Sequence, residues 1–69
     1  MKAEFYVIRD NKTNGFVTDI HSTYIESNGD VFRAIRIPQL EIARSVVCLL
    51  KSHYDVTIVR IELDFEDCE

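Results

Sequence analysis

The 69-residue chain has no tryptophan, one proline, two glycines and two cysteines. Two cysteines allow at most one disulfide. Two isolated glycines do not make the glycine-rich loop that cradles a phosphate, and we expect no nucleotide site of that kind. No apolar run approaches the length of about 20 residues that crosses a bilayer, so no membrane association is expected.

The first residues also lack the features of an export signal. Met1 to Glu4 lead directly into an alternating stretch, without the roughly 7 to 15 apolar residues of a signal peptide. We therefore expect a cytoplasmic protein. Cys68 lies in a charged end segment, where a disulfide would have to fix residues that tend to fray, so Cys48 and Cys68 are predicted to be free thiols.

Composition favours one small folded unit. Hydrophobic residues make up 46% of the chain and charged residues 29%, a ratio typical of globular proteins. A chain of this size buries only about 60% of its extended surface on folding, which leaves few side chains to line a deep active site. We expect a single α+β domain over residues 1–65, followed by an acidic, frayed end at residues 66–69.

The first part of the chain has the pattern of a hairpin. Residues 4–9 are aromatic and β-branched, which predicts a strand. Asn14-Gly15 tolerates the positive φ of a hairpin turn, and residues 16–21 resume a strand pattern. By parity, Phe16 and Ile20 share one side of that second strand.

A third strand is predicted over residues 31–37, which are again rich in β-branched and aromatic types. Residues 22–30 between the two strand patterns are predicted to be a loop with some strand character. Pro38 ends the third strand and suits the first turn of a helix.

The remaining chain changes period twice. Residues 38–53 predict an amphipathic helix, since apolar side chains recur three and four positions apart. Residues 55–65 then alternate with period two, which predicts a strand half buried against that helix. The apolar positions are Leu40, Ala43, Val46, Val47 and Leu50 on the helix, and Val59, Ile61, Leu63 and Phe65 on the strand.

These elements predict a small, mainly antiparallel sheet, in the sequence order β-β-β-α-β, with the one helix packed on one face. Phe5 and Val7 are assigned to the helix side, because the hydroxyl of Tyr6 prefers a wet site. The other face is then either an open surface for a partner or a second copy, or is half covered by residues 22–30. The candidate partner-binding residues on it are Tyr6, Ile8, Val56, Ile58 and Arg60.

The net charge of −4 is concentrated at one end. The rest of the chain is close to neutral, which argues against a general affinity for nucleic acid. The acidic end either keeps the protein soluble or docks on a basic partner. The residues of this acidic patch are Glu62, Asp64, Glu66, Asp67 and Glu69.

Groups that could carry chemistry are sparse. His21, His53 and the two cysteines are the only soft metal ligands, and they show no pair at the spacing of a structural zinc site. The acidic residues lie at a solvated end rather than in a cleft that would shift their pKa values. We therefore predict no metal site, no cofactor and no enzymatic activity.

Two alternatives to protein binding remain open. Arg33, Arg36 and Arg60, with nearby aromatic residues, could bind single-stranded nucleic acid, although Arg33 and Arg36 point to opposite faces by strand parity. The acidic patch could instead imitate the phosphates of a nucleic acid, which would require its acids to be spaced along a rigid surface.

The opening Tyr6-Val7-Ile8-Arg9-Asp10, followed by Lys12-Thr13, Gly15 and a new strand, resembles the start of small uncharacterised proteins encoded by phages and prophages of Gram-positive bacteria. Residues 34–37 before the helix and 59–63 after it are also similar. That family offers no catalytic residues to carry over. The resemblance implies a small intracellular accessory protein that binds and modulates a host or phage protein.

Overall fold

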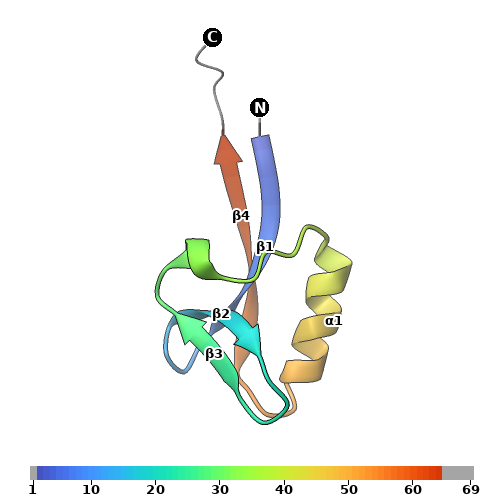
Figure 1. Ribbon diagram of the computed structural model, residues 1–69. Coiled ribbons are helices and arrows are strands. Elements are labelled where there is room, and N and C mark those ends of the chain that lie inside the picture. The colour runs from blue at the N-terminus through green and yellow to red at the C-terminus, as the bar shows by residue number, and fades with distance from the viewer. Residues whose placement is uncertain (1, 65–69) are drawn as a thin grey trace.

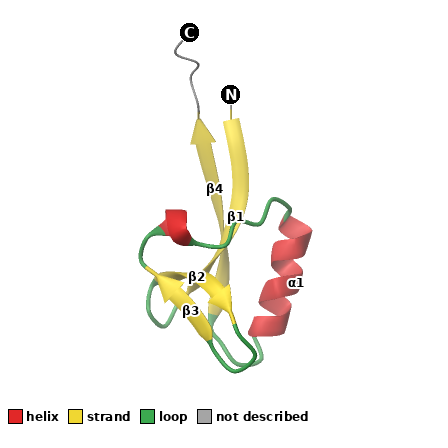
Figure 2. Cartoon of the chain, in the orientation of Figure 1, coloured by secondary structure: helices red, strands yellow, loops and turns green. Residues whose placement is uncertain are grey.

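A computed structural model of the chain describes residues 2–64. It contains a four-stranded antiparallel sheet in the order β3-β2-β1-β4, one α-helix and one short 3₁₀ helix (Figures 1 and 2). The predicted α+β class is therefore confirmed, with one helix beside an antiparallel sheet. The elements are β1 (Lys2–Asp10), β2 (Gly15–Ile20), β3 (Ile25–Asn28), η1 (Val31–Arg33), α1 (Leu40–Leu50) and β4 (Val56–Asp64).

The longest pairing joins β1 to β4. Their register runs without interruption from Lys2 opposite Asp64 to Asp10 opposite Val56. One half of this ribbon extends away from the rest of the fold, toward the end where β1 begins (Figure 1). The ribbon is therefore the element on which the smaller hairpin and the helix are placed.

β2 pairs with β1 only at the turn and then diverges from it. Arg9 lies opposite Phe16, but the carbonyl of Val17 already accepts from Ile35 N–H at 3.0 Å. Tyr6 and Ile37 exchange both backbone hydrogen bonds, at 2.7 and 2.9 Å. Residues 35–37 thus fill the gap that opens between β1 and β2.

The predicted position of the third strand is wrong. The strand lies at Ile25–Asn28, inside the predicted loop, and residues 31–33 form η1. The Asp30 carboxylate accepts from Phe32 N–H at 3.0 Å and so caps this turn. Local capping and the pairing of β3 with β2 override the β propensity of residues 31–37, of which only Ile37 bridges to a strand.

The helix covers the face that the sequence assigned to solvent. Ile8 and Val56 are 2% and 3% exposed and form one apolar cluster with α1. Tyr6 and Ile58 pack beside them as partly buried residues. The assignment of Tyr6, Ile8, Val56 and Ile58 to an open face is therefore wrong. The other buried members of the cluster are Val17, Ile37, Ala43, Val47 and Leu50.

The reason for the wrong assignment lies in Tyr6. Its hydroxyl donates to the Glu4 carboxylate at 3.0 Å, at an exposed position, so the phenol keeps a polar partner while its ring packs on the helix side. The preference of a tyrosine hydroxyl for a polar site is satisfied on this face as well, and it does not decide which face the helix covers.

Phe5 and Val7 belong to a second apolar cluster on the opposite face of the ribbon. Ala34 is buried against them, and Val31 packs on the cluster from η1. The 31–34 segment, rather than residues 22–30, therefore covers this face. The partly buried residues that complete the cluster are Phe16, Val59, Ile61 and Leu63.

Ile8→Ala tests the position of α1. We expect the free energy of unfolding to fall by about 2–4 kcal/mol, because a buried side chain is lost from the helix cluster. Leu49→Ala, at a helix position that is 78% exposed, should change it by less than about 0.5 kcal/mol. Urea denaturation measures both. A loss at Ile8 as small as that at Leu49 would contradict the packing.

Candidate functional site

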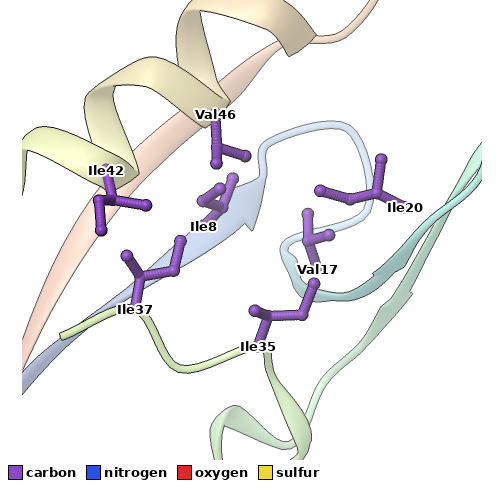
Figure 3. A pocket seen from close by; sticks show the side chains of 7 residues that line it. All are labelled: Ile8, Val17, Ile20, Ile35, Ile37, Ile42 and Val46. Atoms are coloured by element: carbon purple, nitrogen blue, oxygen red, sulfur yellow. The ribbon is translucent and has the colours of Figure 1, made fainter. Parts of the chain in front are cut away.

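An apolar hollow of about 220 Å³ lies between α1 and the sheet. Figure 3 shows Ile42 and Val46 of the helix above Ile8, with Ile35 and Ile37 below it. All seven lining residues are aliphatic: Ile8, Val17, Ile20, Ile35, Ile37, Ile42 and Val46. The hollow is therefore a continuation of the helix cluster that opens to the surface.

A β-bulge brings Ile20 to this hollow. Val17 lies opposite Ser27, but Asp19 lies opposite Glu26, so Thr18 is an extra residue in β2. Strict alternation would place Val17 and Ile20 on opposite faces, whereas both line the hollow. The predicted side of Ile20 is therefore wrong, because strict alternation along residues 16–21 does not allow for the bulge.

The hollow can hold an apolar group but offers no chemistry. It is larger than the apolar cavity of about 150 Å³ that binds benzene, and smaller than the roughly 300–1,000 Å³ of pockets for small ligands. Ile20 and Ile42 at its rim are 42% and 48% exposed. No polar side chain lines it to orient a ligand, so it suits an apolar side chain.

The outer edge of β4 is a second candidate surface. No described strand pairs with it, because β4 ends the sheet. Tyr6 uses its N–H and C=O for Ile37, away from β4, and therefore Arg60, directly opposite Tyr6, points its own N–H and C=O outward. By alternation, the backbone groups of Ile58 and Glu62 point outward too.

The side chains at this edge are charged and mutually paired. Arg60 lies 3.3 Å from the Glu62 carboxylate and 3.9 Å from that of Glu4. All three side chains are exposed, at 46% to 60%. Such exposed pairs contribute little to stability, of order 0–1 kcal/mol, and they remain accessible to a partner.

The predicted partner-binding residues lie together on one face of the β1–β4 ribbon, but most of them are covered there. Of the partner-binding set, only Arg60 is exposed, whereas Ile8 and Val56 are buried in the core. Glu62 and Asp64 end β4, and Glu66, Asp67 and Glu69 lie outside the described residues, as does the predicted tail.

The three arginines considered for nucleic acid do not share one surface. Arg36 lies over the Phe5 ring, 5.4 Å from its centroid, on the face opposite that of Tyr6 and Arg60. Arg33 is 3.9 Å from Asp30. The described residues thus present no common basic face built from these three side chains.

One group of side chains in the described residues could hold a metal ion: Asp19, His21 and Glu26. They lie where β2 and β3 meet at the end of their hairpin, at the positions that follow the bulge. Sequence reasoning missed this group, because it looked for pairs of histidines and cysteines and not for carboxylates brought across a hairpin.

Tyr6 lies on β1 directly opposite Arg60 of β4, and the ionisation of its phenol can be followed by ultraviolet absorbance. The hydrogen bond to Glu4 raises the pKa of Tyr6 above its ordinary value of 10.0, with smaller contributions from desolvation and the Glu4 charge. The folded state holds this proton more tightly than the unfolded chain, so its contribution to stability is present below pH 10 and is lost as pH rises through the raised pKa.

Glu4→Gln should lower the pKa of Tyr6, because it removes the charged acceptor that favours the protonated phenol. Ultraviolet titration of the tyrosines measures this shift, and Tyr6→Phe identifies which transition belongs to Tyr6. Glu26→Gln, on β3, should leave that transition in place. An unchanged Tyr6 pKa in Glu4→Gln would show that the hydrogen bond does not form.

Comparison with known proteins identifies no relative. No family model, no curated protein and no solved structure matches the chain. Among the described residues, no helix has the length and apolar character needed to cross a membrane.

Proposed function

We propose that the chain is a non-enzymatic protein-interaction module that binds by adding a strand to the outer edge of β4, with a second copy of the chain as the partner. The observation that carries this proposal is the placement of Arg60 and Glu62 on the edge of β4 that no described strand pairs with, two residues apart and opposite in charge. Strand addition at a sheet edge is a common mode of protein recognition.

A two-fold axis through Ile61, perpendicular to the sheet, gives a self-complementary register. Antiparallel pairing about this residue puts Arg60 of each copy directly opposite Glu62 of the other. The backbone groups of both residues point outward, so both can join the new ladder. Opposite charges directly across a strand pair contribute about 0.2–1 kcal/mol each relative to alanine.

The same register aligns the apolar residues of β4. Ile61 meets Ile61 of the second copy, and Val59 meets Leu63, all on the face away from α1. These side chains are only partly buried within one chain, so pairing removes more of their surface from water. Charges and apolar side chains therefore favour the same alignment.

Neighbouring registers that keep the faces matched are less favourable. Centring the pair on Arg60 puts two arginines opposite each other, and centring it on Glu62 does the same with two glutamates. Like charges directly opposite each other destabilise a strand pair. The charges on this edge thus select one register and oppose unspecific strand addition.

The apolar hollow beside α1 does not indicate which partner would bind there. The opposite charges of Arg60 and Glu62 on β4 do indicate a partner, namely a second copy of the chain. Nucleic-acid binding gains no support, because Arg33, Arg36 and Arg60 form no common basic face among the described residues. A role as a phosphate-imitating decoy depends on acids that mostly lie outside the described residues. Modulation of a host or phage protein stays a hypothesis derived from the resemblance.

Sedimentation velocity at increasing protein concentration tests the proposal. The unmodified chain should form a dimer. Arg60→Glu and Glu62→Arg should each weaken it, because each variant alone puts like charges opposite each other at two positions. An equimolar mixture of the two variants should dimerise again, because every facing pair in the mixed dimer is then complementary.

Lys12→Glu makes the same change of charge as Arg60→Glu, at the exposed turn between β1 and β2, and should leave the dimer intact. Circular dichroism establishes that each variant is folded before mixing. A chain that remains a monomer at all concentrations, or a variant mixture that does not associate when the unmodified chain does, would contradict the proposed register.

A further inference from the structure

The bulge in β2 creates a side-chain cluster separate from the β4 edge. Because Thr18 is the extra residue, Asp19 rather than Thr18 lies directly opposite Glu26. His21 follows two residues after Asp19, at the start of the turn that joins β2 to β3. Two carboxylates and one imidazole therefore meet at this end of the hairpin.

The nitrogen and oxygen atoms of the cluster converge. The His21 Nε2 lies 3.3 Å from Glu26 Oε1 and 3.6 Å from Asp19 Oδ2. One ligand atom from each residue lies within 4.8 Å of the others. Both carboxylates are exposed, at 60% for Asp19 and 54% for Glu26, and lie on either side of the partly buried imidazole.

Neighbouring contacts hold Asp19 and His21 in these orientations. The second oxygen of Asp19, Oδ1, accepts from Ile20 N–H at 2.9 Å, which leaves Oδ2 for His21. The His21 ring stacks on Tyr24 with 4.2 Å between centroids. His21 N–H also donates to the Tyr24 carbonyl at 2.9 Å, which fixes the backbone of the turn. The cluster is thus partly preorganised.

The Nε2 atom of His21 itself is shielded from solvent, although the side chain as a whole is 33% exposed. It lies close to both carboxylates but makes no hydrogen bond of good geometry among the described residues. Buried polar nitrogen atoms almost always have a partner. A cation between the three side chains would accept the nitrogen lone pair and neutralise both carboxylates.

We infer that Asp19, His21 and Glu26 form a binding site for a divalent transition-metal ion of the zinc class. Zinc bonds to nitrogen and oxygen of about 2.0–2.2 Å place the ligands of a tetrahedral site about 3.4 Å apart. The distances from His21 Nε2 to the two carboxylate oxygens, 3.3 and 3.6 Å, agree with that separation.

The ligand set also selects the class of metal. Imidazole favours zinc, nickel, cobalt and copper, whereas magnesium and calcium prefer sites made of oxygen atoms alone. Three protein ligands leave one tetrahedral position for water or for a group from a partner. The site binds the ion at the end of the hairpin, where it ties β2 to β3.

Isothermal titration of the metal-free chain with zinc chloride tests the site. We expect one ion per chain, and thermal unfolding at a higher temperature when zinc is present, because the ion binds the folded state. His21→Gln should weaken binding by at least about tenfold, as should Asp19→Asn and Glu26→Gln, since each removes a ligand. Calcium chloride should give no binding over the same range.

His53→Gln is the matched control. It removes the other histidine, which is exposed after the end of α1, and should leave zinc affinity unchanged. Nitrogen NMR of the unmodified chain gives a second readout that needs no variant: zinc should shift Nε2 of His21 and not the ring nitrogens of His53.

Three results would overturn the inference. The first is the absence of saturable zinc binding, which would make the cluster a histidine paired with two carboxylates. The second is equal affinity in His21→Gln, which would place the ion on the cysteines or elsewhere. The third is a zinc-dependent shift at His53 alone.

Discussion

The pairing of β1 with β4 is the constraint on which the rest of the structure depends. It joins segments more than 40 residues apart, from Lys2 opposite Asp64 to Asp10 opposite Val56, and the entropy of closing that long loop opposes it. Both apolar clusters form on this one ribbon: Ile8 lies in the helix cluster and Val7 in the other. Burial on two faces therefore offsets the cost of a single long-range pairing.

The helix and strand that were predicted correctly are those whose hydrophobic period continues through the whole segment. The alternation in residues 55–65 and the helical period in 38–53 yielded β4 and α1 to within a few residues. Residues 31–37 have high strand propensity, but a capped turn and the space between β1 and β2 determine their structure. The alternation of side chains correctly divides the residues of β1 between the two faces of the sheet. It does not show which of the two faces the helix covers.

Both candidate sites depend on how the strands pair, which the sequence pattern does not show. Arg60 was singled out from the sequence, but the structure alone shows that its backbone faces an unpaired edge. The Asp19, His21 and Glu26 cluster requires the bulge at Thr18, and one residue of register decides which side chain faces Glu26. The register of one strand pair therefore decides which side chains come together at these candidate sites.

Native-state hydrogen exchange of the β4 amides, at a concentration low enough for the chain to be monomeric, is the most direct test of the β1–β4 ribbon with one free edge. The account predicts an alternating pattern. The amides of Val59 and Ile61 point toward β1 and should be protected, whereas those of Arg60 and Glu62 point outward and should exchange rapidly. Uniform protection along β4, or slow exchange at Arg60 with rapid exchange at Ile61, would contradict it.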